Sequence, residues 1–159
     1  MPNLMTLNLS TLSWSAVGPA SDGFRELRFL SITNMPLLTS APSLRNASKL
    51  VSLEMKNLAS LTALDDGYFL GVPRLQTLIL DNWPRWNNAY PTSMGTLTVL
   101  RHLRIAAMNS WTGPDRLPAY VLGGTAGGYN PNLRTLELAN MFFMRGLPNS
   151  QFVLNLEKI

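Results

Sequence analysis

Apolar side chains return along this chain with one fixed spacing, at the first, fourth, sixth and ninth positions of a repeating unit. The unit is clearest in the segment LVSLEMKNL, which covers residues 50–58. Units with this spacing begin near residues 4, 27, 50, 75, 100 and 133, and a partial unit begins at residue 156. Internal repeats of roughly 20 to 50 residues are typical of solenoid proteins. The pattern therefore predicts one repeat domain over residues 1–159.

The centre of each unit alternates between apolar and variable residues, as a short strand with one buried face requires. In the clearest unit this alternation directs Leu53 and Met55 inward and Glu54 outward. Strands from successive units would pair in parallel, about 4.8 Å apart, in one sheet. The segments between strands are short and broken by Pro and Gly, so we expect single helical turns, 3-10 pieces and extended chain there. Asp65 and Asp66 are expected to begin one such helical turn.

Asparagine recurs at the eighth position of the unit, directly after the predicted strand. Asparagine tolerates left-handed backbone and its side chain bonds to nearby backbone, so it suits the end of a strand. The pattern therefore predicts a turn at this position in the four units that carry it, at Asn34, Asn57, Asn82 and Asn140.

These residues resemble the leucine-rich repeat family, whose pattern is LxxLxLxx(N/C)xxL. The matching segments are LVSLEMKNLASL at residues 50–61 and LRTLELANMFFMRGLP at residues 133–148. The segment YPTSMGTLTVLRHLRI, residues 90–105, is similar to the inter-repeat phrase of irregular plant-type and immune-receptor-like repeats. The resemblance implies an α/β repeat solenoid, with a curved parallel sheet on the concave side and short helical, 3-10 or extended returns on the convex side.

The chain departs from the family pattern at the ninth position, where the family has a buried Asn or Cys. An apolar stack is expected in place of the family's asparagine ladder, because the residues here are Leu12, Met35, Leu58, Trp83, Met108 and Met141.

Composition narrows the possible functions. The hydrophobic fraction is 46% and the charged fraction 14%, as in folded proteins. The net charge of +4 comes from 13 basic and 9 acidic residues without a basic run, so we expect no nucleic-acid partner. No apolar run is long enough to span a bilayer, so we expect no membrane insertion. The absence of cysteine and of a recognisable signal segment favours the cytoplasm, although the compartment stays open.

Candidate chemistry is sparse, and we expect no enzyme activity, no metal and no cofactor. His102 is the only histidine, and no acidic or metal-ligating residues converge on it in the sequence. The glycine-rich insertion at 123–128 lacks the spacing of a phosphate-binding loop. Trp83, Trp86 and Trp111 fall on apolar positions of the unit and are expected to pack in the core.

The outward positions of the predicted sheet carry a mixed, low-charge set of side chains that suits a protein or peptide partner. Arginine and aromatic residues contribute most to interfaces, and charged neighbours set specificity. The candidate partner-binding residues are Arg28, Phe29, Glu54, Ile79, Arg101, His102, Arg104, Arg134 and Glu137.

Two functions follow from the family resemblance. The first is a non-enzymatic recognition module that binds a protein or peptide on the concave sheet face. The alternative is a structural or regulatory segment of a larger, receptor-like multidomain protein, which packs on its own neighbouring domains. Because the first unit starts near Met1 and the last is partial, we also expect the chain to be a piece of a longer repeat protein, or its ends to be covered by neighbouring repeats or subunits.

Overall fold

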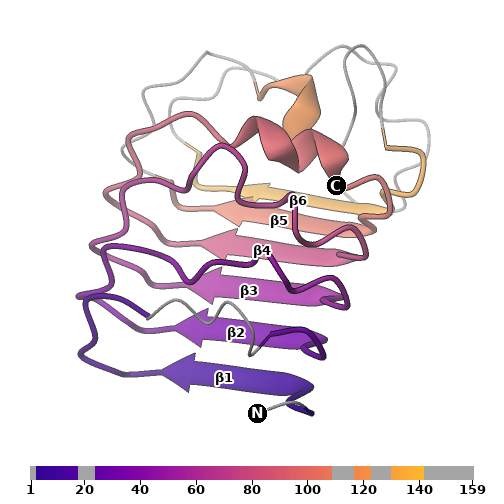
Figure 1. The fold of residues 1–159 in the computed structure, drawn as a ribbon. Coiled ribbons are helices and arrows are strands. Elements are labelled where there is room, and N and C mark those ends of the chain that lie inside the picture. The colour runs from indigo at the N-terminus through magenta and orange to yellow at the C-terminus, as the bar shows by residue number, and fades with distance from the viewer. Residues whose placement is uncertain (1–2, 18–23, 109–116, 123–129, 142–159) are drawn as a thin grey trace.

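The protein is described by a computed structural model that covers residues 3–17, 24–108, 117–122 and 130–141. Within these residues the chain forms one six-stranded parallel sheet in the order β1-β2-β3-β4-β5-β6, so each strand pairs with the strand of the next repeat. Figure 1 shows the arrows of the sheet stacked one above another and pointing the same way. The strands are β1 (Thr6–Ser10), β2 (Phe29–Thr33), β3 (Ser52–Lys56), β4 (Thr77–Asp81), β5 (His102–Ala106) and β6 (Thr135–Ala139). The predicted solenoid with one parallel sheet is confirmed.

The register of the sheet places equivalent residues of successive repeats side by side. Leu53 pairs with Leu30 on one side and with Leu78 on the other. All three leucines are buried, at 2% exposure or less. The alternation predicted from the sequence is confirmed in β2 to β5, because the fourth and sixth positions of each repeat point into the core.

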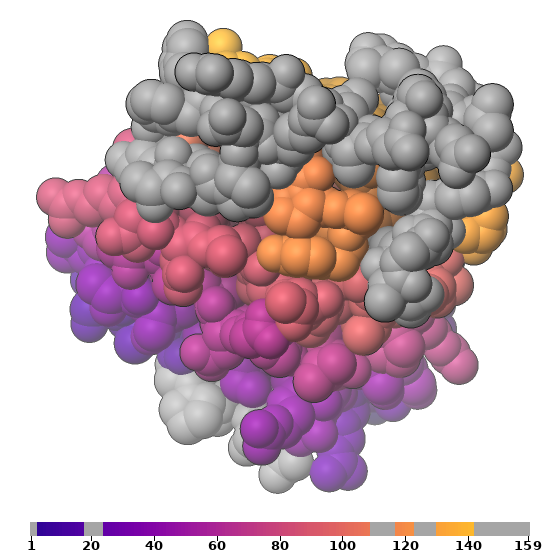
Figure 2. Space-filling view, turned by 90° about the horizontal axis from the view of Figure 1, so that it is seen from above, coloured from indigo at the N-terminus to yellow at the C-terminus, as the bar shows by residue number. Residues whose placement is uncertain are grey.

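The segments that return from one strand to the next close the other side of the core. Where the structure describes them, they contain turns, extended chain and two 3-10 helices, η1 (Thr92–Thr96) and η2 (Ala119–Leu122), which pack together. Figure 2 views the stack from its β6 end, where the orange atoms of residues 117–122 lie near the centre. Phe69 and Met94 fill the core from this side, and both are completely buried.

No helix begins at Asp65 and Asp66, although a single hydrogen-bonded turn does, because the Tyr68 amide donates to the Asp65 carbonyl oxygen at 2.9 Å. Residues 66–71 make successive turns instead, and the Asp66 carboxylate accepts hydrogen bonds from the Thr92 amide at 2.7 Å and from the Thr92 hydroxyl at 2.6 Å. The carboxylate therefore caps the start of η1 in the next repeat rather than a helix of its own.

The eighth position of every repeat has left-handed backbone, with φ between 53° and 57°. The residues at this position are Thr11, Asn34, Asn57, Asn82, Ala107 and Asn140. The predicted strand end with left-handed backbone is confirmed at all four asparagines. Three of their side chains also form an exposed asparagine ladder: Asn57 Nδ2 donates to Asn34 Oδ1 at 2.6 Å, and Asn82 Nδ2 donates to Asn57 Oδ1 at 2.8 Å.

The ninth position carries the expected apolar stack. Met35, Leu58, Trp83 and Met108 are buried there, at 1% exposure or less. The Trp83 indole also donates a hydrogen bond from Nε1 to the Met55 carbonyl oxygen at 3.0 Å. The ninth position of this repeat therefore places a buried hydrogen-bond donor against the backbone of the preceding repeat.

The two end strands are less well covered than the strands between them. Leu7 and Leu9 of β1 are half-buried, although they occupy the positions that are buried in β2 to β5. Met5 and Trp14, in the same repeat, are 54% and 50% exposed. The predictions for Trp111, for the insertion at 123–128 and for the partial unit at 156 lie outside the described residues.

Candidate functional site

The outer face of the sheet is formed by the third, fifth and seventh positions of the repeats, which point away from the core. Four of the sequence-predicted residues meet there around one hollow of about 310 Å³, namely Ile79, His102, Arg104 and Glu137. Thr77, Leu103 and Thr135 complete its lining. Because β4, β5 and β6 pair in register, His102 lies between Thr77 and Thr135. The hollow therefore spans three repeats.

Arg104 is held on this face by two carboxylates. Its Nη2 lies 3.0 Å from Asp81 Oδ2, and its Nη1 lies 2.7 Å from Glu137 Oε2. These hydrogen bonds, to Glu137 first and to Asp81 second, raise the pKa of Arg104 above its ordinary value. Arg104 is thus already paired with two carboxylates, so it orders the hollow but does not make it basic.

Two further predicted residues lie elsewhere on the outer face. Phe29 is 49% exposed on β2. Glu54, on β3, pairs with Lys56 and accepts a hydrogen bond from the Ser31 hydroxyl at 3.2 Å. Phe29 therefore offers exposed apolar surface, whereas Glu54 already has partners on its own sheet.

The remaining predicted residues, Arg28, Arg101 and Arg134, lie just before β2, β5 and β6. They belong to a surface that we call the N-terminal rim, formed by the residues that lead into the strands. The rim also carries basic residues that the sequence reasoning missed, Arg25, Lys49 and Arg74. Reading the residue that precedes each repeat across the stack would have found Lys49 and Arg74.

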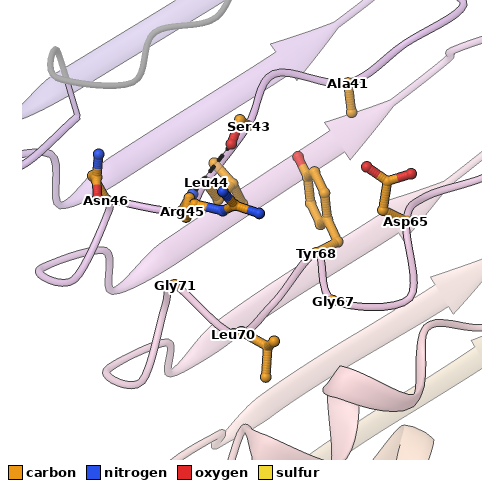
Figure 3. Close-up of a pocket in the computed structure, with 10 residues that line it drawn as sticks. All are labelled: Ala41, Ser43, Leu44, Arg45, Asn46, Asp65, Gly67, Tyr68, Leu70 and Gly71. Carbon is orange, nitrogen blue, oxygen red and sulfur yellow. Dashed lines mark hydrogen bonds between the residues drawn. The ribbon is translucent and has the colours of Figure 1, made fainter.

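A further pocket lies on the return side, between residues 41–46 and 65–71, with a volume of about 450 Å³ (Figure 3). Sequence reasoning did not anticipate it. Figure 3 shows the Tyr68 ring standing between the segment of Leu44 and Arg45 and the side chain of Asp65. Burial, with a smaller effect of the Asp65 charge, raises the pKa of Tyr68, so its hydroxyl stays protonated. That hydroxyl is buried and has no hydrogen-bond partner in the part of the chain described here.

Gly71 brings the two walls of this pocket together. A Cβ on Gly71 would lie 2.2 Å from the Leu44 carbonyl oxygen and 2.7 Å from Arg45 backbone atoms, which is closer than such atoms approach. The two returns therefore touch through their backbones at this end. In the sequence this contact is marked by Gly71 alone, and a single glycine does not indicate a pocket.

The described residues contain no group of three or more His, Cys, Asp or Glu side chains that could hold a metal ion. None of the helices described here is long and apolar enough to cross a membrane. His102 is exposed, and within the described ranges no acidic side chain bonds to it.

Together these features define the class of the protein as a parallel β-solenoid with a side-chain-rich outer sheet face and a basic rim. Comparisons of the chain with protein-family models, with curated proteins and with solved structures give no match.

Proposed function

We propose that the chain is a leucine-rich-repeat solenoid that recognises a protein or peptide partner and has no enzyme activity. In this proposal the outer sheet face is the concave side, and the returns form the convex side. The spacing of the apolar positions supports the family, and the short, irregular returns fit its plant-type, immune-receptor-like members.

The observation that carries the proposed binding role is the hollow across β4, β5 and β6. It combines an apolar floor at Ile79 with polar groups at His102 and Arg104. Pockets with a few polar groups around apolar surface are the common form of binding sites. Arg104 is fixed by its two carboxylates, so little side-chain entropy is lost when a partner contacts it.

A second candidate is a structural segment that packs on neighbouring domains of a larger protein. The exposed Met5 and Trp14 favour it, because both belong to the first repeat, whose large apolar side chains a neighbouring domain could cover. In this case the contact would lie on the β1 end of the stack and not on the sheet face.

Affinity capture with the purified chain tests the choice between these functions. We compare the wild type with Ile79→Asp on the sheet face, with Trp14→Asp at the β1 end, and with the control Leu70→Asp on the return side. Leu70 is 65% exposed, so its variant changes charge without disturbing the core. Proteins identified by mass spectrometry should be retained by wild type and Leu70→Asp and lost from Ile79→Asp.

Loss from Trp14→Asp alone would favour the structural segment. Equal retention by all four proteins would refute recognition on the sheet face. Urea melts of each variant establish that a lost interaction does not reflect unfolding.

A further inference from the structure

The basic residues of the chain are distributed unevenly over the described surface. Six of them gather on the N-terminal rim, where Glu26 is the single acidic residue of the described rim segments. Lys49 Nζ lies 2.7 Å from a Glu26 carboxylate oxygen, so these two charges compensate each other. The six are Arg25, Arg28, Lys49, Arg74, Arg101 and Arg134.

Three rim arginines differ from the arginine on the sheet face. Arg28, Arg74 and Arg101 are exposed, and their guanidinium groups make no hydrogen bond or ion pair within the described part of the chain. Arg104, in contrast, has two carboxylate partners. The rim therefore carries uncompensated positive charge, and the sheet face beside it does not.

Two of these arginines line a single groove. Arg74 and Arg101 lie on neighbouring repeats and border a groove of about 370 Å³. Its remaining lining comes from Val51, Val99, Gln76 and Asn132. A guanidinium fork pairs with carboxylates through two parallel hydrogen bonds, and valines beside it offer apolar contact. The lining thus fits alternating acidic and apolar groups.

The backbone of the rim is already paired. Gln76 N donates to Val51 O at 2.8 Å, and Arg101 N donates to Gln76 O at 2.8 Å. A ligand on the rim therefore cannot add to the sheet as an extra strand and must be recognised by side chains. In an extended peptide, alternate side chains lie about 7 Å apart, whereas neighbouring strands lie about 4.8 Å apart. The long, exposed arginine side chains can spread to cover this difference of about 2 Å.

We propose that the N-terminal rim binds an extended acidic segment of a partner protein. Arg74 and Arg101 pair with its carboxylates, and Val51 and Val99 contact the apolar residues between them. The proposal rests on the function as a recognition module and deepens it by naming the partner's chemistry and a second contact surface. A peptide fits better than a nucleic acid, because the lining of the groove at Arg74 and Arg101 includes no aromatic side chain on which bases could stack.

Selection from a random dodecapeptide phage library on the immobilised full chain tests this inference. The enriched sequences should alternate Asp or Glu with Leu, Val or Ile. One enriched peptide is then synthesised, labelled with a fluorophore and titrated by anisotropy against wild type, the rim variant Arg74→Glu/Arg101→Glu and the control Arg45→Glu/Arg85→Glu. Arg45 and Arg85 are exposed and lie off the rim, so the control changes the net charge equally.

Affinity should fall by more than about tenfold in the rim variant and much less in the control, because close charge pairs contribute more than net charge. Enrichment of peptides without acidic residues, or equal losses in both variants, would overturn the proposal. If the peptides bind the rim variant normally but no longer bind Ile79→Asp, the proposed sheet-face function would be supported and the proposed rim site would be refuted. Failure to select any peptide would count against both. Tighter binding of a single-stranded oligothymidylate than of the peptide at physiological salt would assign the rim to nucleic acid instead.

Discussion

Ala107 occupies a backbone position that the other repeats give mostly to asparagine. Its φ is 53°, in the left-handed region where a Cβ crowds the following carbonyl, which costs about 1–2 kcal/mol. Asparagine tolerates this region better than alanine does. Ala107 also lies between Asn82 and Asn140, so Ala107→Asn would both relieve strain and place an amide where the asparagine ladder stops.

The expected gain in unfolding free energy is about 1–2 kcal/mol. Relief of part of the left-handed strain contributes about 0.5–1 kcal/mol. One new exposed amide–amide hydrogen bond, with the geometry of the Asn82–Asn57 bond, contributes about 0.5 kcal/mol or more. For a chain of this size, each kcal/mol corresponds to a melting-temperature rise of about 2–4 °C.

Urea and thermal melts of three variants measure this gain. Ala107→Gly relieves the strain without adding a side chain, and its freer unfolded state offsets about 0.5–1 kcal/mol, so it should gain less than Ala107→Asn. Ala59→Asn is the matched control, because Ala59 is half-buried at a position without left-handed backbone, and it should stay within about 0.5 kcal/mol of wild type. An Ala107→Asn protein no more stable than wild type would refute the assignment of strain. If Ala107→Gly and Ala107→Asn had equal unfolding free energies, the extended asparagine ladder would contribute no stability.

Three further changes test the packing and the electrostatics. Leu78→Ala should cost about 2–5 kcal/mol in urea melts, because Leu78 is completely buried. Gly71→Ala should cost about 1–3 kcal/mol, because the new Cβ would meet the Leu44 carbonyl oxygen and the returns must separate. The Thr92 hydroxyl, and then its amide, lower the pKa of Asp66 below its ordinary value of 3.8. The carboxylate therefore stabilises the fold at pH values above 3.8, and this contribution is lost as the pH falls through the lower pKa of the folded state. Asp66→Asn should therefore weaken the acid dependence of the melting temperature, and an unchanged dependence would contradict the pairing.

Much of the fold could be predicted because the repeat constrains each position many times over. Every strand places the same apolar positions inward, so the inward orientation inferred for Leu53 and Met55 also applied to their counterparts in the other repeats. Asn57 and its equivalents identified the strand ends for the same reason. Asp66 was different, since its partner Thr92 lies in the next repeat and local sequence favoured a helical turn instead.

The candidate site was less predictable, because it depends on which side chains meet across repeats. Reading outward positions grouped Ile79 with His102, which do share a hollow. It also listed Arg104 among the partner-binding residues without anticipating Asp81, the second carboxylate that holds it. Arg74 precedes the first apolar position and belongs to no strand, so a search confined to strand positions could not assign it to a surface.

The hydrogen bond of Trp83 limits how the repeats of this chain can be exchanged with one another. Its indole bonds to the Met55 carbonyl oxygen of the preceding repeat, and Ser93 and Thr92 bond back to Phe69 and Asp66 of that same repeat. The third and fourth repeats are therefore not interchangeable modules, since each completes polar groups of the other. Exchange, duplication or grafting of repeats should succeed when this pair moves as one unit. Cutting between the two would leave a buried carbonyl and a severed cap on one side.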